Sequence, residues 1–274
     1  MEEIIRVEGL WHVYPGGVEA LRGVDLTIKQ GEFIAIIGQN GSGKTTLVKH
    51  FNGLLKPTRG KVYVYGIDTT KASTYELSRK VGYVFQNPDH QIYSDSVYDE
   101  VAFGPRNLGF PEDEIKEIVK HVLEELELSE YVETPPFMLG KGLRQRLAVA
   151  SILAMKPEVL VVDEPTTGQD WKECVKLVEF MDRLNKEGHT IIMVTHNMKL
   201  VSMFAKRVIV MKDGRILLDG PTEEVMYNIE TLREAYIKPP DVVLIDYRLR
   251  NLLDGKPSLR VEDLAEKIYQ ACKR

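Results

Sequence analysis

The stretch Phe33-Ile-Ala-Ile-Ile-Gly-Gln-Asn-Gly-Ser-Gly-Lys-Thr-Thr46 decides the fold of this chain. Its first five residues are continuously apolar, as expected for a strand that is buried on both faces. The next nine contain the spacing Gly-x4-Gly-Lys-Thr and run into a helix-like segment, Leu47–Phe51. A glycine-rich turn between a buried strand and a helix is the context that confirms a phosphate-binding loop. The stretch therefore predicts an α/β protein that binds a nucleotide.

The residues of this loop have separate predicted roles. The glycines let several backbone N–H groups point toward phosphate, and the helix N-terminus adds a favourable dipole field. Lys44 is expected to neutralise the β- and γ-phosphates of ATP, and Thr45 to give its hydroxyl to Mg²⁺. The complete motif in this context disfavours the alternative, a glycine-rich turn with an incidental lysine. The predicted ATP-binding residues of the loop are Gly38, Gln39, Asn40, Gly41, Ser42, Gly43, Lys44, Thr45 and Thr46.

Two adjacent carboxylates, Asp163 and Glu164, follow a second apolar run, Val159–Val162. They fall at the C-terminal edge of a predicted buried strand, where α/β sheets bind their ligands. Asp163 is expected to hold Mg²⁺, and Glu164 to accept a proton from the attacking water or to orient it. Neighbouring strand residues point to opposite sides, so both reach the site only if the strand ends there, as Pro165 favours. The alternative is two solvated carboxylates at a strand end.

Strands alternate with helices along the chain, which predicts a largely parallel core sheet with crossovers. Near the N-terminus, Ile4–Gly9 and Val24–Ile28 alternate apolar with polar residues, as half-buried antiparallel strands do. The section from Ser96 to Glu133 has helical spacing, and Pro239-Pro240 marks a break. Further strands are predicted at Lys61–Tyr65, Val81–Phe85, Thr190–Val194 and Arg207–Lys212, a hairpin turn at Asp213-Gly214, and helices at Leu147–Met155, Lys172–Glu187 and Val261–Ala271.

The length and composition of the chain disfavour several classes of function. The chain has 274 residues, 43% hydrophobic and 28% charged, enough for one substantial core with a small second lobe or appendage. The net charge of -5 offers no global attraction to nucleic acid. Cys174 and Cys272 lack CxxC spacing, which disfavours a disulfide scaffold or a zinc site. The first residues lack the apolar region of a signal peptide, and the apolar runs are far shorter than the roughly 20 residues of a membrane span. A role at a membrane is therefore expected to need an anchor elsewhere.

The order of the motifs resembles that of ATP-binding-cassette (ABC) transporter ATPase subunits over about residues 1–225. The resemblance implies the P-loop ABC-ATPase fold, which has a mainly parallel core sheet and an antiparallel β lobe. It also implies a helical lobe at about residues 87–155. Residues 226–274 are expected to form a small C-terminal appendage that takes part in dimerisation.

The resemblance assigns roles to four further residues. Tyr14 matches the aromatic residue on which the family stacks adenine, and Gln86 matches the glutamine that reaches Mg²⁺ or water and senses the membrane partner. His196 closes the run Thr190-Ile-Ile-Met-Val-Thr-His and matches the switch histidine that contacts the γ-phosphate. Asp170 matches the D-loop aspartate used across the dimer interface. For a lone tyrosine or histidine, a packing or structural role is the alternative.

The signature segment departs from the family pattern Leu-Ser-Gly-Gly-Gln. It reads Leu139-Gly-Lys-Gly-Leu143, followed by Arg144-Gln-Arg146. In the family this segment donates to the γ-phosphate on the opposite subunit, so Gly140, Lys141 and Gly142 are expected to act in trans. Gly140 lacks the serine hydroxyl and Leu143 lacks an amide, although Lys141 and the helix dipole could still attract phosphate. The departure favours a heterodimer with a second ATPase subunit over a homodimer.

The stretch from Gln86 to Gly109 looks like the energy-coupling-factor (ECF) subgroup, which imports vitamins and metal ions. Such transporters pair two ATPases at the cytoplasmic face of the membrane with a transmembrane coupling protein and a substrate-binding membrane protein. The stretch would form a groove for coupling helices, with Ile92, Val97 and Phe103 as exposed apolar residues. The alternatives are the ATPase of a binding-protein-dependent ABC importer, a soluble non-transport ABC ATPase, and a regulatory subunit that binds ATP without hydrolysis.

Overall fold

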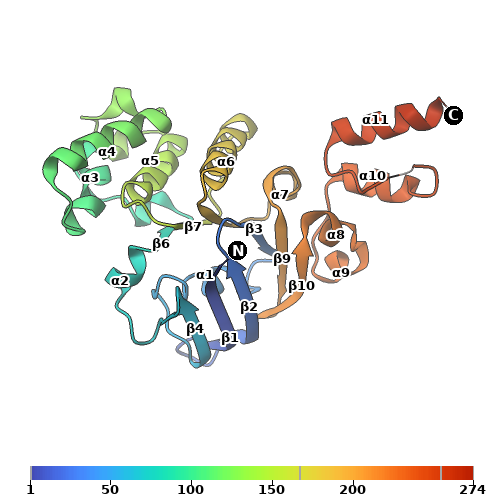
Figure 1. Cartoon of the computed structure of the whole chain (residues 1–274), viewed down its shortest axis with the longest axis horizontal. Coiled ribbons are helices and arrows are strands. Elements are labelled where there is room, and N and C mark those ends of the chain that lie inside the picture. The colour runs from blue at the N-terminus through green and yellow to red at the C-terminus, as the bar shows by residue number, and fades with distance from the viewer. Residues whose placement is uncertain (1, 167, 254, 274) are drawn as a thin grey trace.

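The computed structural model describes residues 2–166, 168–253 and 255–273, and it contains two β-sheets, a helical lobe and a C-terminal pair of helices (Figure 1). The strands are β1 (Glu3–Val13), β2 (Glu19–Lys29), β3 (Phe33–Gly38), β4 (Arg59–Val64), β5 (Ile67–Asp68), β6 (Val81–Val84), β7 (Val159–Asp163), β8 (Thr190–Val194), β9 (Arg207–Lys212) and β10 (Arg215–Pro221). The α-helices are α1 (Lys44–Val48), α2 (Thr74–Ser78), α3 (Val97–Asn107), α4 (Glu112–Glu125), α5 (Lys141–Leu153), α6 (Trp171–Lys186), α7 (Met198–Phe204), α8 (Thr222–Tyr227), α9 (Ile229–Glu234), α10 (Asp241–Leu249) and α11 (Val261–Cys272).

The core sheet has the strand order β10-β9-β3-β8-β7-β6. Strand β3 lies parallel to both of its neighbours, and β8, β7 and β6 continue the parallel pairing. Every residue of β3, β7 and β8 is buried, as expected for strands covered on both faces. Among the described strands of this sheet only β10 is antiparallel, and it joins β9 through Asp213 and Gly214, whose φ angles of 48° and 75° fit a two-residue hairpin turn. The predicted largely parallel α/β sheet and its closing hairpin are confirmed.

The second sheet has the order β2-β1-β4-β5 and is antiparallel throughout. Its buried residues, such as Ile5 and Ile28, share a core with Ile36 of β3 and Met211 of β9. The alternation of apolar and polar residues correctly predicted these strands, which extend further than the sequence indicated. The antiparallel lobe therefore packs directly beside the strand that leads into the phosphate loop.

The helical lobe consists of α3, α4 and α5, drawn in shades of green in Figure 1. Helix α4 buries the apolar residues whose spacing predicted it, including Ile115, Val119 and Val122. Helix α5 begins at Lys141, six residues before its predicted start. Its first turns carry Lys, Gly, Arg and Gln, so the hydrophobic spacing begins only at Leu147.

The predicted exposure of Ile92 and Val97 is wrong. Their exposed fractions are 3% and 0%, and both belong to the core of the helical lobe. Val97 opens the first turn of α3, whose inner face packs onto the lobe. Phe103, on the same helix, is 46% exposed as expected.

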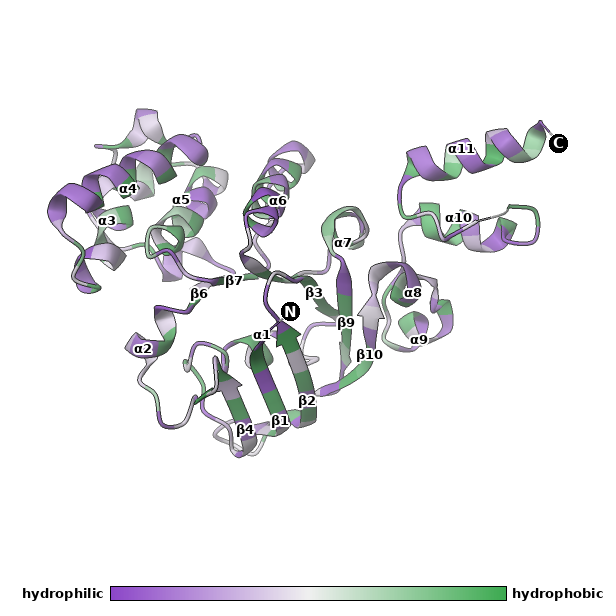
Figure 2. Ribbon diagram, viewed as in Figure 1, coloured by the Kyte–Doolittle hydropathy of each residue, from purple (hydrophilic) through white to green (hydrophobic). Residues whose placement is uncertain are grey.

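The C-terminal segment contains two helices, α10 and α11, of which the sequence predicted only the second. Helix α10 begins directly after Pro239-Pro240. Asp246 of α10 is buried and accepts two hydrogen bonds from Ser258, one from its N–H and one from its hydroxyl. It also forms a 3.1 Å ion pair with Lys267 of α11, which holds the two helices together. Both helices are banded in purple and green in Figure 2, as amphipathic helices are. In the described part of the chain, every helix is too short or too polar to span a membrane.

Candidate nucleotide-binding site

The phosphate loop needs glycine at two crowded positions. Gly38 and Gly43 have φ angles of 154° and 101°. A Cβ atom at Gly38 would lie 2.3 Å from the carbonyl oxygen of Met211, and one at Gly43 would lie 2.6 Å from that of Ala20. Any larger residue would collide with backbone that cannot move aside cheaply. The loop is thus held tightly between β9 and β2 while its inner side stays open.

A cavity of about 440 Å³ lies over the loop, and a second of about 570 Å³ adjoins it. Both are lined by Asn40, Gln86 and Glu164, so they form one continuous depression. The first is lined by Tyr14, Val18, Glu19, Ala20, Asn40, Gly41, Gly43, Lys44, Thr45, Thr46, Gln86 and Glu164. The second adds Gly38, Gln39, His196, Met198, Tyr236, Ile237 and Lys238. Most of the residues predicted from sequence to bind ATP or to catalyse its hydrolysis are thus brought around one space.

Lys44 lies at the base of this depression and is buried. Its ammonium donates to the carbonyl oxygens of Gly38 and Gln39, both at 2.8 Å. Burial lowers the pKa of Lys44, while the nearby Glu164 and Asp163 carboxylates act in the opposite direction. The lysine therefore spans the start of the loop and carries its charge toward the two acidic residues.

Thr45 and Asp163 meet although they are far apart in sequence. The Thr45 hydroxyl donates to Asp163 Oδ2 at 2.8 Å, and the carboxylate is almost fully buried. Asp163 Oδ1 is also buried and has no hydrogen-bond partner among the described residues. Mg²⁺ prefers oxygen ligands and is commonly held by one or two protein groups plus phosphate oxygens. The unpartnered carboxylate oxygen beside a hydroxyl fits such an ion, with Gln86 on the wall of the same cavity.

Tyr83 is a residue of this site that the sequence did not indicate. Its hydroxyl donates to the same Asp163 Oδ2 at 2.8 Å. Burial, followed by the charge of Asp163, raises the pKa of Tyr83, so the phenol stays protonated and acts as the donor. No local pattern in the sequence indicated Tyr83, because its place in the site depends on β6 lying beside β7, with the carboxyl ends of these parallel strands at one sheet edge.

Glu164 leaves the sheet directly after β7. Its φ angle is 50°, and its N–H donates to the carbonyl oxygen of Val194 at 2.8 Å. The strand therefore ends between the two carboxylates, as the predicted roles of Asp163 and Glu164 require. Glu164 Oε2 lies 2.7 Å from Nδ1 of His196, whose side chain is 69% exposed. Burial raises the pKa of Glu164, and His196 and Lys44 oppose that rise.

Tyr14 lines the first cavity, whereas His196 lines the second. Its hydroxyl is 3.1 Å from the Thr46 hydroxyl, and His12 contacts its ring edge-on at a centroid distance of 4.6 Å. The stacking of adenine on Tyr14 stays a prediction. Ser42 does not line the described cavities; it is buried, and its N–H donates to the Gln39 carbonyl at 3.1 Å, which shapes the loop.

The signature and D-loop residues lie apart from this depression. Gly140, Lys141 and Gly142 open helix α5, and the Lys141 ammonium lies against Gly168. Asp170 caps helix α6 by accepting the N–H of Glu173 at 2.9 Å. None of these residues is among those that line the two cavities. Their action on a nucleotide of a second subunit stays a prediction.

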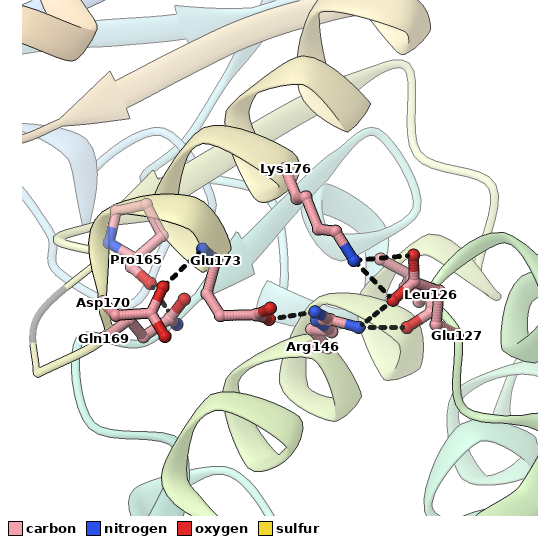
Figure 3. Close-up of polar contacts among 8 residues, drawn as sticks. All are labelled: Leu126, Glu127, Arg146, Pro165, Gln169, Asp170, Glu173 and Lys176. Atoms are coloured by element: carbon pink, nitrogen blue, oxygen red, sulfur yellow. Dashed lines mark hydrogen bonds and ion pairs between the residues drawn. The ribbon is translucent and has the colours of Figure 1, made fainter.

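A network of charged side chains joins the signature helix to the start of α6 (Figure 3). Arg146 of α5 donates to Glu127, just after α4, at 2.8 Å, and also pairs with Glu173 of α6. Lys176 reaches Glu127 from the next turn of α6 at 3.1 Å. Because Asp170 caps the helix that carries Glu173, the network connects the helical lobe to the D-loop.

Comparison with known proteins identifies the family. The family model described as "ABC transporter" matches residues 21–167, more than half of the chain. The chain is 51% identical over 261 residues to the ABC transporter ATP-binding protein TTE1589 of Caldanaerobacter subterraneus subsp. tengcongensis. That match covers 95% of this chain but 45% of the relative, so the chain spans less than half of that protein. It is 42% identical to the energy-coupling factor transporter ATP-binding protein EcfA of Methanocaldococcus jannaschii, covering 94% of this chain and 92% of EcfA.

Comparison with solved structures identifies the same family. The fold is similar to that of cbiO1 from Clostridium perfringens, described as part of the ABC transporter complex cbiONQ, with a TM-score of 0.76 and 38% identity over 88% of this chain and 98% of that one. It is also similar to the dimeric ATP-binding cassette MJ0796 bound to ADP and Pi, with a TM-score of 0.73 and 30% identity over 80% and 99% of the two chains. The chain belongs to the ABC transporter family of ATP-binding proteins, and its fold is that of an ABC ATPase cassette.

Proposed function

We propose that this chain is the ATP-hydrolysing subunit of an ECF-type importer for vitamins or metal ions, bound at the cytoplasmic face of the membrane. The observation that carries the proposal is the convergence of Lys44, Glu164 and His196 on one depression, with the bonded pair Thr45 and Asp163 at its side. The similarity to proteins named EcfA supports the ECF subgroup.

Each group in the depression has a separate task in hydrolysis. The loop N–H groups and Lys44 hold the phosphates, and Tyr14 supports the adenine. Glu164, buried beside the loop, accepts a proton from the attacking water. His196 orients Glu164 through the 2.7 Å contact and contacts the γ-phosphate. Mg²⁺, when bound by Thr45, Asp163 and Gln86, supplies neutralisation of the phosphate charge.

A groove on the helical lobe supports coupling to a membrane protein. It has a volume of about 290 Å³, and its walls include Tyr75, Tyr93 and Phe103. The rings of Tyr93 and Phe103 pack edge-on at 4.8 Å and are both exposed. Gln91, also in the groove, accepts the N–H of Phe85 at 3.1 Å and donates to a carbonyl of α5 at 2.7 Å. We infer that a helix of the transmembrane coupling protein occupies the groove and thereby senses the segment that carries Gln86.

The pairing with a second ATPase follows from the signature segment. Gly140 occupies the N-cap of α5 without a side chain that could donate to phosphate, so two copies of this chain would form two weakened sites. A partner with a complete signature would leave one full site, formed by this chain's loop. We further propose that residues 226–274 form a C-terminal extension of the ATPase domain of residues 1–225 and take part in dimerisation. Leu252, Val261 and Tyr269 expose apolar surface there that a second subunit would cover.

Capture of partners from membranes tests this function. The tagged chain, a Phe103→Glu variant and an Ile67→Glu control are each used as bait; Ile67 is comparably exposed but lies on β5, away from the groove. The wild type and the control are expected to recover a second ATPase and polytopic membrane proteins. Phe103→Glu is expected to lose the membrane proteins while it keeps the second ATPase and ATP turnover. Recovery of ribosomes or DNA-repair factors, or equal recovery by all three baits, would contradict the proposal.

A further inference from the structure

The carboxylate of Asp163 accepts hydrogen bonds from hydroxyl groups of two different elements, helix α1 and strand β6. Thr45, in the first turn of α1, and Tyr83, on β6, each donate to Oδ2 at 2.8 Å. Oδ1 is the buried oxygen without a partner among the described residues. The two donors therefore fix the plane of the carboxylate and leave Oδ1 as the oxygen that remains for a metal ion.

We propose that Tyr83 is a positioning residue of the metal site, whose hydroxyl fixes Asp163 and ties the strand leading to Gln86 to that carboxylate. The inference rests on the proposed Mg²⁺-dependent function. Tyr83 does not touch the nucleotide cavity and acts only through Asp163. Loss of a group that hydrogen-bonds and orients a metal ligand typically lowers metal affinity by about 10–100-fold.

The packing of Tyr83 does not require its hydroxyl. The ring is buried, contacts Phe85 edge-on at a centroid distance of 4.9 Å, and pairs in register with Val161 of β7. Phenylalanine would keep these contacts. What it would lose is the hydrogen bond to Asp163, the one contact of the hydroxyl that bears on the site.

The strand arrangement gives this hydrogen bond a second consequence. Gln86 follows Tyr83 by three residues, and β6 ends at Val84 between them. The bond crosses from β6 to the end of β7, so it fixes the start of the Gln86 segment relative to the metal carboxylate. A movement of that segment, such as one driven from the groove near Phe103, would act on the bond between Tyr83 and Asp163.

Metal affinity, measured separately from turnover, tests the proposal. Mn²⁺ serves as the probe, and free Mn²⁺ is followed by electron paramagnetic resonance as it is titrated into the full-length chain with ADP. The variants are Tyr83→Phe and, as a matched control, Tyr63→Phe on β4, which removes a hydroxyl outside the site. ADP affinity in EDTA and the thermal unfolding midpoint are measured for each protein. Should Tyr83→Phe not fold, Tyr83→Met deletes the same hydroxyl with an adaptable apolar side chain.

We expect Tyr83→Phe to weaken Mn²⁺ binding by about tenfold or more, with ADP affinity in EDTA unchanged. Tyr63→Phe is expected to match the wild type in both measurements. Wild-type Mn²⁺ affinity in Tyr83→Phe would overturn the inference. An equal loss of ADP affinity with and without metal would also overturn it, because such a loss would indicate that Tyr83 acts through packing. If the wild type itself bound no Mn²⁺ with nucleotide, the proposed metal-dependent function would fail instead, so the two failures are distinguishable.

Discussion

Nδ1 of His196 lies 2.7 Å from Oε2 of Glu164, although the two residues follow the ends of different strands. The register of the core sheet accounts for this contact, because Asp163 at the end of β7 pairs with Val194 at the end of β8. Glu164 is the first residue after β7, and His196 is the second residue after β8. A buried carboxylate is thereby placed against an exposed imidazole at the edge where parallel sheets bind ligands.

Replacing Glu164 by Gln removes the predicted proton acceptor with little change of shape. The expected result is a fall in ATP turnover of about 10²–10⁴-fold, the usual contribution of a general base, with ATP binding retained. Steady-state phosphate release and equilibrium ATP binding measure the two effects. Glu158→Gln is the control, since Glu158 is half-exposed at the opposite end of β7 and pairs with Lys80. Turnover by Glu164→Gln at the rate of the control would exclude Glu164 as the acceptor.

The network at Arg146 is expected to stabilise the contact between the helical lobe and α6. The Arg146 side chain is only 10% exposed, so Arg146→Ala leaves Glu173 without its cation. We expect Arg146→Ala to lower the free energy of unfolding by about 2–3 kcal/mol. Glu127→Gln, at the exposed end of the network, should cost less than about 1 kcal/mol. Urea unfolding measures the unfolding free energy of both variants. Equal losses in the two variants would contradict a larger stabilising role for the buried side chain of Arg146.

His50 should make stability depend on pH. It is fully buried, its Nδ1 hydrogen-bonds the carbonyl of Thr46 at 2.7 Å, and burial lowers the pKa of His50 to about 4. The folded state therefore binds fewer protons than the unfolded state between about pH 6.5 and pH 4, so stability is lost as the pH falls through this window. From pH 7 to pH 5 the loss from His50 should be about 2 kcal/mol.

Urea unfolding at both pH values, for wild type and His50→Gln, tests this dependence. The glutamine variant can be less stable overall, so the compared quantity is the change in unfolding free energy between the two pH values. A change as large in His50→Gln as in the wild type would assign the pH dependence to other groups.

Two glycines of the phosphate loop have similar backbone conformations but different surroundings, so substitutions at the two positions can be compared. Gly43 and Gly41 both have positive φ, at 101° and 81°, but a Cβ at Gly43 meets the Ala20 carbonyl whereas one at Gly41 meets nothing within 4 Å. Gly43→Ala should therefore lose about 1–3 kcal/mol more unfolding free energy than Gly41→Ala, because it adds overpacking to backbone strain. Thermal or urea unfolding measures the difference. Equal losses of unfolding free energy in the two variants would show that backbone strain alone accounts for the cost of each substitution.

The sequence predicted the core of the site because its signals are local. The run from Phe33 to Thr46 specifies a strand, a loop and a helix by adjacent residues, and Asp163-Glu164 marks the end of a second strand. Tyr83 escaped prediction because its role depends on which strand lies beside β7, a fact of topology rather than of pattern. Ile92 and Val97 were expected to be exposed, because an apolar residue in a polar segment does not reveal whether the lobe core or a partner covers it.

The sequence predicted the longer helices with displaced boundaries and did not predict several short ones, among them α2, α7, α8 and α9. Helix α5 extends through the charged residues at Lys141–Arg146, where the backbone is helical but the side chains lack apolar spacing. Helix α10 was missed altogether, since it is short and directly follows two prolines. The tyrosine, isoleucine and lysine at positions 236–238 line the depression from the segment before α10, and no local pattern pointed to that placement.

Binding of ATP by Lys44→Ala tests the central claim most directly, because the whole site is built around a triphosphate held by this loop. Calorimetric titration with ATP and Mg²⁺ is compared for wild type, Lys44→Ala and Lys49→Ala, a lysine just beyond the same helix. We predict that Lys44→Ala weakens binding by about tenfold or more, as the loss of a charge-assisted contact to phosphate implies, and that Lys49→Ala binds as the wild type does. Wild-type affinity and turnover in Lys44→Ala would contradict the account.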